Sequence, residues 1–345
     1  MAATFLTSCT SHKDREPFKN SHIEYQSSTS NLLAILKAYW NDNRTQATPK
    51  VEIPVQTLTR QQLLDSSQDA VFRLGHSTLL LRIDGEFILL DPVFSERAFP
   101  VQWMGPKRFH HAPISIEELP QISAVIISHD HYDHLDKHAI KQLAEKTDKF
   151  VTPLKVGDHL LDWGVPRDKI IELDWWQHTQ VNTLKITATP AQHFSGRGLF
   201  DRDQTLWASW VIQGWDSSIF FSGDSGYFDG FKQIGERLGP FDITLIETGA
   251  YHSLWSDIHM MPEQSLQAHI DLKGKVMLPI HNGTFDLALH DWFEPLERLQ
   301  QLAHENDVQI RTPIFGAEVT IKQPLATTHW WRTVPHAAPD TLVSD

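Results

Sequence analysis

Cysteine is almost absent from this chain, which has one cysteine among 345 residues. A single cysteine excludes internal disulfides, cysteine-rich zinc modules and iron–sulfur clusters held by several thiolates. Histidine, by contrast, occurs 20 times. Any metal site in this protein would therefore use nitrogen and oxygen ligands.

Basic residues and long apolar runs are also scarce. The 30 Lys and Arg residues are outnumbered by 43 Asp and Glu residues, which gives a formal net charge of −13. Because clustered Lys and Arg are needed to neutralise nucleic-acid phosphates, we expect no nucleic-acid partner. No stretch approaches the roughly 18 to 20 apolar residues of a membrane-spanning helix. With 41% hydrophobic and 21% charged residues, the chain is expected to be soluble and globular, without a transmembrane span.

The N-terminal region differs in composition from the rest. We expect residues 1–54 to form a polar tail with a short helix at Leu32 to Trp40, and residues 55–345 to form one domain, because no repeat or internal linker interrupts them. The helix either packs on this domain or touches a membrane or a partner. Leu6 to Cys9 resembles the lipidation box of a bacterial lipoprotein, although the segment before Cys9 is too short for the apolar stretch of about 7 to 15 residues in a secretory signal. Two locations stay open: the cytoplasm, or the cell envelope through a lipidated Cys9.

Apolar strand patterns alternate with helical patterns along residues 55–345. The turn at Asp84 and Gly85 between two apolar runs is a strong hairpin signal. Strands are predicted at Val71–Ile83, Glu86–Leu90, Ala124–Ser128, Leu184–Thr189, Ser209–Ile212, Ser218–Ser222, Ile243–Ile246 and Val276–Pro279. Helices are predicted at Lys137–Lys146, Phe228–Leu238, Glu263–Leu272 and Trp292–Glu305. The alternation indicates a layered α/β domain whose sheets are covered by helices.

The segment Ser128 to His134 carries three histidines and two aspartates directly after a buried strand. His129 and His131 are two residues apart and can point at one ion. The adjacent Asp133 and His134 can reach a second ion on the other side. Two metals about 3.5 to 4 Å apart need such a division of ligands and a bridging group between the cations.

Three later segments offer the missing ligands, each at the end of an apolar strand. His193 follows the predicted strand Leu184–Thr189, and His281 follows Val276–Pro279. Asp224 follows Ser218–Ser222 and lies between Gly223 and Gly226. A single histidine in such a place is more often an ordinary hydrogen-bonded residue. Seven candidates in a coherent order, around a His-x-His-x-Asp-His pattern, instead favour a binuclear metal site.

These motifs resemble the metallo-β-lactamase superfamily, whose hallmark is the pattern seen here from His129 to His134. The resemblance extends from about Val71 to Phe315 and is closest to the N-acylphosphatidylethanolamine phospholipase D group and its bacterial relatives. The segments that carry it are Leu89–Phe109, Ile127–Asp136, Ile171–Trp176, Thr189–Phe194, Ser222–Phe228, Gly239–Asp242 and Pro279–Phe285. The resemblance implies a four-layer αββα sandwich with two Zn²⁺ ions at one edge, and it makes residues 55–345 a catalytic domain.

Residue roles also follow from the resemblance. One zinc would be held by His129, His131 and His193, and the other by Asp133, His134 and His281. Asp224 would bridge the two ions, so that catalysis depends on Asp224 and Asp133. His259 would lie near the substrate phosphate and steady it or protonate the leaving group.

The implied reaction is hydrolysis of N-acylphosphatidylethanolamine by a metal-bridging hydroxide, which releases phosphatidic acid and an N-acylethanolamine. Gln102, Tyr251 and Trp255 are candidate contacts to this phospholipid, in a protein that touches the membrane peripherally. The resembled enzyme is a homodimer. A lactonase or small phosphate-ester hydrolase of the same superfamily is the main alternative, since a zinc pair can also polarise a carbonyl group. A non-enzymatic metal-binding protein of the cell envelope is the second.

Overall fold

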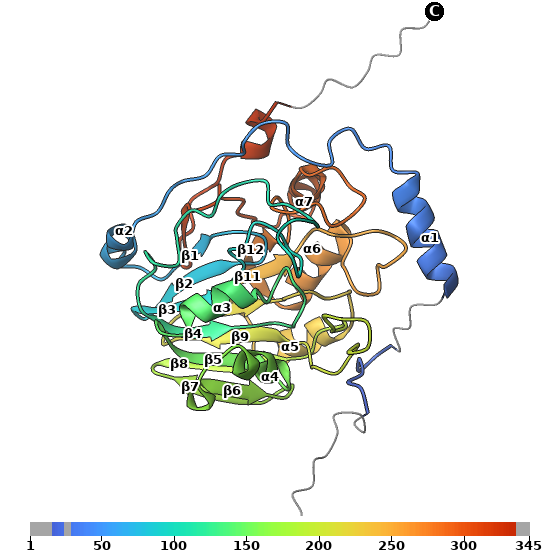
Figure 1. Ribbon diagram of the computed structural model, residues 1–345. Helices are drawn as coiled ribbons and strands as arrows, with labels where there is room; N and C mark the ends of the chain where they lie inside the picture. The colour runs from blue at the N-terminus through green and yellow to red at the C-terminus, as the bar shows by residue number, and fades with distance from the viewer. Residues whose placement is uncertain (1–15, 24–28, 336–345) are drawn as a thin grey trace, which may run out of the picture.

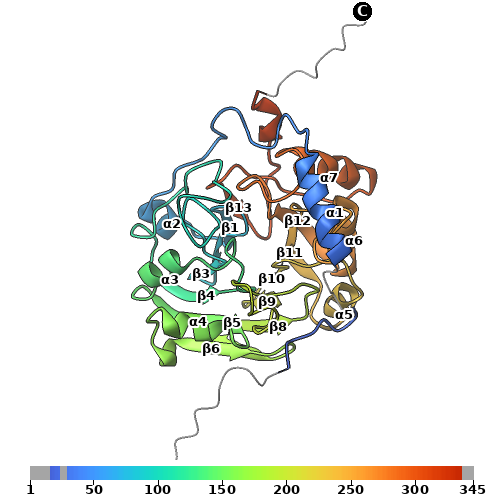
Figure 2. The same ribbon diagram turned by 45° about the vertical axis from the view of Figure 1, so that its right-hand side comes forward.

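The computed structural model describes residues 16–23 and 29–335 of the chain, so Cys9 and its proposed lipidation lie outside the described residues. Two β-sheets pack face to face, and helices cover both outer faces (Figures 1 and 2). In Figure 2, α2, α3 and α4 lie on the left of the sheets and α5, α6 and α7 lie on the right. The predicted αββα architecture is confirmed.

The first sheet has the strand order β13-β1-β2-β3-β4-β5-β6. Its strands are β1 (Ala70–Arg73), β2 (Leu79–Ile83), β3 (Glu86–Leu90), β4 (Ile122–Ile126), β5 (Thr147–Pro153), β6 (Ile170–Leu173) and β13 (Glu318–Thr320). Strands β2 and β3 are antiparallel across the predicted turn, where Asp84 has φ 54° and Gly85 has φ 83°. Two positive φ values in a two-residue loop are typical of the hairpin turns that match strand twist. Strands β3 to β6 run parallel.

The second sheet has the order β12-β11-β10-β9-β8-β7. Its strands are β7 (His178–Val181), β8 (Leu184–Thr189), β9 (Ser209–Gln213), β10 (Ser218–Phe221), β11 (Phe241–Glu247) and β12 (Gly274–Ile280). Strands β7 to β10 are antiparallel, whereas β10, β11 and β12 are parallel. The carboxyl ends of these last three strands therefore meet at one edge.

The core lies in three layers because side chains alternate along the strands. Leu79, Leu81 and Ile83 of β2 point between the sheets, where they join residues of the second sheet, while Leu80 points outward. The helices on the outer face of the first sheet are α2 (Arg60–Asp65), α3 (Lys137–Leu143) and α4 (Val156–Asp162). Those on the second sheet are α5 (Gly230–Arg237), α6 (Pro262–Asp271) and α7 (Glu294–Glu305). Two short 3-10 helices, Arg167–Lys169 and Trp330–Thr333, complete the list.

One strand prediction was wrong in a way that matters for function. The apolar run Val71–Ile83 is not one strand, because the chain turns between β1 and β2, where Leu74 N and Gly75 N both donate to Thr78 O. Glycine inside an apolar run often marks such a turn. The turn carries His76 to the edge of the sheet. Strands β5, β6, β7 and β13 and helices α2 and α4 were not predicted, because they are short or rich in polar residues.

The N-terminal region packs against the domain at several points. Helix α1 (Thr29–Trp40) places Tyr39 against Trp255, with stacked rings 6.3 Å apart. Further along, Arg44 pairs with Asp286 at 3.0 Å. Asn20, in the predicted tail, accepts a hydrogen bond from His193 N at 3.0 Å. Residues 16–23 are thus held by the domain, and the boundary between residues 54 and 55 stays a prediction.

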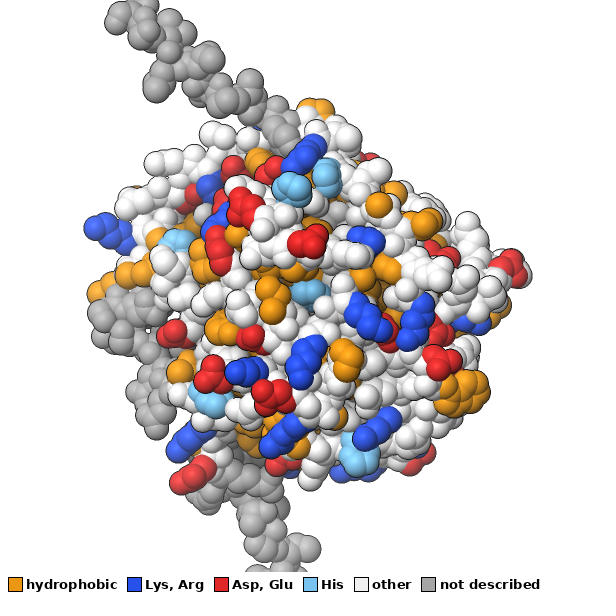
Figure 3. Space-filling model, turned by 180° about the vertical axis from the view of Figure 1, so that it is seen from behind, with side chains coloured by type: hydrophobic (Ala, Val, Ile, Leu, Met, Phe, Trp, Pro, Cys, Tyr) orange, Lys and Arg blue, Asp and Glu red, His pale blue; other side chains and the backbone are white. Residues whose placement is uncertain are grey.

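The surface carries mixed charge on the face in Figure 3, where Lys and Arg side chains are interspersed with Asp and Glu. Helix α1 has exposed apolar side chains at Leu33, Leu36 and Trp40, the last of which is 90% exposed. Among the described residues, no helix combines the length and the apolar character needed to span a bilayer.

Candidate metal centre and active site

Polar side chains gather where five strands end. The carboxyl ends of the parallel strands β3 and β4 meet at one edge of the first sheet, and those of β10, β11 and β12 meet at one edge of the second. Side chains from both sets of ends contact one another. The residues at or just after these ends are Asp91, His129, Asp224, Glu247 and His281. His281 has φ 63° and Asp91 has φ 37°, so the chain turns sharply there.

Three histidines form the first cluster. His129 Nε2 lies 2.8 Å from His131 Nδ1, and His193 Nε2 lies 3.3 Å from the same atom. Burial lowers the pKa of all three imidazoles. They are therefore neutral near pH 7, which is the form that binds metals.

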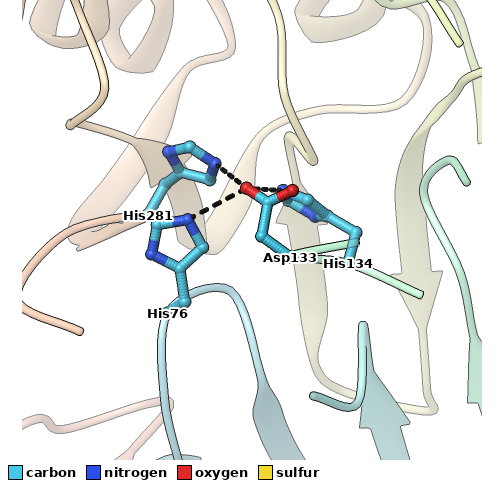
Figure 4. A group of neighbouring side chains, drawn as sticks. All are labelled: His76, Asp133, His134 and His281. Atoms are coloured by element: carbon cyan, nitrogen blue, oxygen red, sulfur yellow. Dashed lines mark ion pairs between the residues drawn. The ribbon is translucent and has the colours of Figure 1, made fainter. Parts of the chain in front are cut away.

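A second cluster surrounds Asp133 (Figure 4). Its Oδ2 lies 3.4 Å from His76 Nε2, 3.6 Å from His134 Nε2 and 3.3 Å from His281 Nε2. In Figure 4, the imidazoles of His76 and His281 approach Asp133 from one side and that of His134 from the other. One carboxylate oxygen thus faces three imidazole nitrogens.

Asp224 lies between the two clusters. Its Oδ1 is 3.0 Å from His134 Nε2 and its Oδ2 is 3.1 Å from His281 Nε2. The same Oδ2 is 3.8 Å from Nε2 of both His129 and His193. Burial would raise the pKa of Asp224, but His134 and His281 outweigh burial and hold it well below its usual range. The structure thus brings together the seven side chains predicted as ligands, with Asp224 in the middle.

Several buried atoms at this edge have no hydrogen-bond partner among the described residues. They are His76 Nδ1 and Nε2, His134 Nε2, Asp224 Oδ1, and His281 Nδ1 and Nε2. Buried polar atoms in proteins are nearly always satisfied, so a group of such atoms facing one another calls for a ligand. Imidazole and carboxylate donors are those that Zn²⁺ prefers when thiolates are absent. The donor set fits divalent cations.

Hydrogen bonds behind the ligands fix their orientation. Asp91 Oδ2 lies 2.6 Å from His134 Nδ1, and its carboxylate also accepts bonds from Ser128 N at 2.7 Å and Ser128 Oγ at 2.5 Å. His193 Nδ1 lies 3.0 Å from the carbonyl oxygen of Ile258. With the Nδ1 hydrogens so engaged, Nε2 of each ring keeps its lone pair for a metal.

Beside the clusters, His259 pairs with a buried carboxylate. Its Nδ1 hydrogen-bonds to Oε1 of Glu247, whose Oε2 accepts a bond from Ser225 N at 2.7 Å. Burial raises the pKa of Glu247. Burial alone would lower the pKa of His259, but the neighbouring Glu247 carboxylate outweighs it and raises that pKa. Because Nδ1 is engaged, Nε2 of His259 is the ring nitrogen that remains available for another group.

A cavity of about 330 Å³ opens on these groups. It is lined on the polar side by His131, Asp133, Asp224, His259 and His281. The apolar side consists of Ile35, Tyr39, Phe194, Ala250, Trp255, Ile258 and Leu287. Two of these residues come from α1, so the N-terminal helix forms part of the wall.

The predicted substrate contacts are distributed unequally. Trp255 lines this cavity, and its contact to a substrate stays a prediction. Gln102 instead lines a separate polar cavity. Tyr251 is buried, donates to Glu294 Oε1 at 2.8 Å and stacks on His290. The structure therefore does not bring Gln102 or Tyr251 to the 330 Å³ cavity beside the predicted ligands, called the metal-side cavity below.

Sequence reasoning missed three residues of the site. His76 was hidden inside a run read as one strand, although Gly75 signals a turn. Asp91 and Glu247 stand at the ends of β3 and β11. The rule that identified His281, a polar residue at the end of a buried strand, could have found both.

Comparisons with known proteins agree with this architecture. A sequence model described as "Beta-lactamase superfamily domain" matches residues 86–282. The chain is 47% identical over 272 residues to an uncharacterised protein of Mycobacterium tuberculosis, a match that covers 78% of this chain and 73% of that protein. It is 33% identical over 263 residues to the N-acyl-phosphatidylethanolamine-hydrolyzing phospholipase D 1 of Caenorhabditis elegans, a match that covers 72% of this chain and 74% of that protein. Isothiocyanate hydrolase from Delia radicum gut bacteria shares the fold, with a TM-score of 0.59 at 20% identity over 73% of this chain and 98% of that chain.

Proposed function

The chain belongs to the metallo-β-lactamase superfamily of metal-dependent hydrolases, and on that basis we propose that it is a binuclear zinc phosphodiesterase acting on a phospholipid. The substrate we propose is N-acylphosphatidylethanolamine, cleaved to phosphatidic acid and an N-acylethanolamine. The observation that carries this proposal is a cavity that is apolar on one side and lined by the metal ligands on the other. A phosphodiester lipid has the same division between an apolar part and a charged part.

The residues that would hold the metals fall into the two clusters described above. One zinc would be bound by His129, His131 and His193. The other would be bound by His76, Asp133, His134 and His281, with Asp224 shared between the two. When bound, such ions make water nucleophilic near neutral pH and polarise a phosphoryl oxygen.

His259 supplies the proton in this proposal. Its Nδ1 is fixed by Glu247, and its raised pKa favours the protonated form near neutral pH. A protonated Nε2 can donate to the alkoxide that leaves as the phosphorus–oxygen bond breaks. Since Glu247 is fully buried, the ring cannot turn away without leaving Oε1 of that carboxylate without its imidazole partner.

The apolar wall supports a lipid substrate. Ile35 and Tyr39 of α1 face Trp255 and Ile258 in one cluster of side chains around the cavity. On its other side, the same helix exposes Leu33, Leu36 and Trp40 to the surroundings. We propose that the exposed side of α1 contacts the membrane through Leu33, Leu36 and Trp40. Its other side lines the cavity.

The experiment incubates the zinc-loaded protein with N-acylphosphatidylethanolamine, with simple phosphodiesters and with a panel of lactones, and identifies the products by mass. In ¹⁸O-labelled water, attack at phosphorus should place the label in phosphatidic acid and leave the N-acylethanolamine unlabelled. The Asp224→Asn variant, which should remain folded, serves as the inactive control. Turnover of lactones without any phosphodiester cleavage would overturn the substrate assignment.

A matched pair of variants tests the apolar wall. Ile35→Asn changes a residue that lines the cavity, whereas Leu36→Asn changes its exposed neighbour on the same helix. With a short-chain lipid dispersed as monomers, Ile35→Asn should raise KM several-fold and leave turnover of a small phosphodiester unchanged. Leu36→Asn should leave both unchanged. Equal effects of the two variants would speak against an acyl-binding wall.

A further inference from the structure

A second, polar cavity lies on the far side of the metal-binding loop. Its volume is about 340 Å³, and the residues of its wall that matter here are Arg97, Tyr132, Lys137, His159 and Arg197. Tyr132 stands between Asp130 and Asp133, so the loop that holds the metal ligands on one side forms a wall of this cavity on the other. No wall residue named here lines the metal-side cavity.

Three cationic side chains face this cavity with donors to spare. Arg197 donates from Nη1 to the carbonyl oxygens of Asp130 and Leu135, which leaves its Nε and Nη2 without an acceptor among the described residues. Its guanidinium lies 3.9 Å from the centre of the Tyr132 ring, which fixes its plane. Arg97 and Lys137 have no carboxylate within ion-pair distance in the described part of the chain.

The cavity wall also contains one carboxylate, Asp136, which is already engaged by backbone hydrogen bonds. Asp136 accepts bonds from the backbone amides of Phe94 at 3.1 Å, Ser95 at 2.8 Å and His138 at 2.8 Å. Asp130, behind the wall, is 3.2 Å from His159 Nε2 and accepts a bond from Gly196 N at 2.8 Å. Asp130, Asp136 and Asp201 lie close enough to act electrostatically on Arg197. Among the described residues, however, none of the three cations forms an ion pair with a carboxylate.

We propose that this cavity binds a phosphate group, either as a free phosphate compound or as the headgroup of an anionic phospholipid. Guanidinium groups recognise phosphate through paired N–H donors. Three cations are better matched by the double negative charge of a phosphate than by the single charge of a carboxylate ligand. Pockets of about 300 to 1,000 Å³ hold small organic ligands, so there is room for a substituent on the phosphate. In a chain with a net charge of −13, such a site depends on local rather than overall charge.

Binding here would act on the metal loop. Arg197 already ties together the carbonyls of Asp130 and Leu135, which flank the ligands Asp133 and His134. An anion held by Arg197 adds interactions to the folded state at this point. Phosphate should therefore raise the thermal unfolding midpoint of the protein.

The test measures phosphate binding by titration calorimetry on the zinc-loaded protein. The double variant Arg97→Gln/Lys137→Gln should lose one phosphate site or bind it at least tenfold more weakly. The control Lys50→Gln/Lys232→Gln removes the same charge from two exposed lysines outside the cavity and should bind as the unmodified protein does. Because phosphate can also bind at the metals, Asp224→Asn is titrated in parallel and should keep the cavity site. Lys137→Gln alone, which removes no hydrogen bond, covers the case in which the double variant does not fold.

A second arm distinguishes the two sources of phosphate. Sedimentation with phosphatidylcholine vesicles, with and without phosphatidic acid, should show a dependence on phosphatidic acid that the double variant loses if the ligand is a headgroup. Loss of the calorimetric signal with unchanged vesicle binding would identify a free phosphate compound. The proposal is overturned if the double variant matches the control in both arms. Neither arm requires turnover, so this outcome is independent of the proposed reaction.

Discussion

Replacing Asp91 by asparagine should weaken metal binding at His134 without touching a ligand. Asp91 is fully buried, and its Oδ2 lies 2.6 Å from His134 Nδ1 and 2.5 Å from Ser128 Oγ. An asparagine of the same shape can still accept the bond from Ser128 N with its oxygen. Its amide NH₂ group then replaces the Oδ2 acceptor, so that its hydrogens face the N–H of His134 Nδ1 and the O–H of Ser128.

The imidazole can relieve this clash by moving its hydrogen from Nδ1 to Nε2, and then the lone pair at Nε2 is lost to the metal. Loss of a partner behind a metal ligand typically costs 10- to 100-fold in metal affinity, or about 1.4 to 2.7 kcal/mol. Leaving buried donors unpaired costs about 1 to 3 kcal/mol of folding stability each. We therefore expect Asp91→Asn to bind zinc tightly at the three-histidine cluster and at least tenfold more weakly at the second.

The assay is a competition titration with a chelating dye, combined with denaturant unfolding. Asp136→Asn is the matched control, because Asp136 is also a buried carboxylate that accepts three hydrogen bonds but contacts no ligand. It should lower stability and leave zinc affinity unchanged. If Asp91→Asn keeps two zinc ions at the original affinity, the reasoning from ligand orientation is refuted.

Three further predictions concern histidines in and outside the site. His259→Ala should keep its zinc but lose at least tenfold in kcat on phosphodiesters, and Glu247→Gln should shift the pH–rate profile; kinetics identical to the original protein would return both to a structural role. His76→Ala should reduce zinc content towards one ion per chain, measured by metal analysis, and unchanged content would remove it from the ligand set. Burial lowers the pKa of His269 to about 4, from the 6.5 of an unperturbed imidazole. Because His269 keeps the ordinary pKa when the chain is unfolded, the unfolded state binds more protons than the folded state below about pH 6.5. Stability should then fall by up to about 3 kcal/mol between pH 6.5 and 4, as followed by urea unfolding. His269→Gln should flatten this dependence, and an equally steep fall in the variant would contradict the assignment.

The clustering of the proposed ligands could be predicted from sequence because most of them obey a local rule. His129, His193, Asp224 and His281 each follow an apolar strand, and the order of strands in a layered α/β fold brings such ends together. His76 broke the rule, since it stands in a turn inside the segment Val71–Ile83, which was predicted as one strand. Gly75 is the one local signal of the turn, and the pairing of β1 with β2 in the folded sheet shows where the segment divides.

The cavity wall could not be predicted in the same way. Ile35 and Tyr39 are more than 200 residues from Trp255 in sequence, and nothing in their local pattern indicates which surface α1 covers. Gln102 and Tyr251 lie in segments near the site, but their side chains point elsewhere. Proximity along the chain identifies loops of an active site better than it identifies the side chains that enter the cavity.

The origin of the cavity wall has a consequence for how such proteins diversify. Helix α1 precedes residues 86–282, the part matched by the superfamily. In the proposed function, α1 thus supplies part of the apolar wall from outside the matched segment, whereas the seven ligands predicted from sequence lie inside it. We therefore expect that exchange of the first 50 residues between relatives would change which substrates the cavity admits and leave the proposed metal ligands in place. Comparative work on substrate preference should therefore begin with the N-terminal helix, which lies outside residues 86–282.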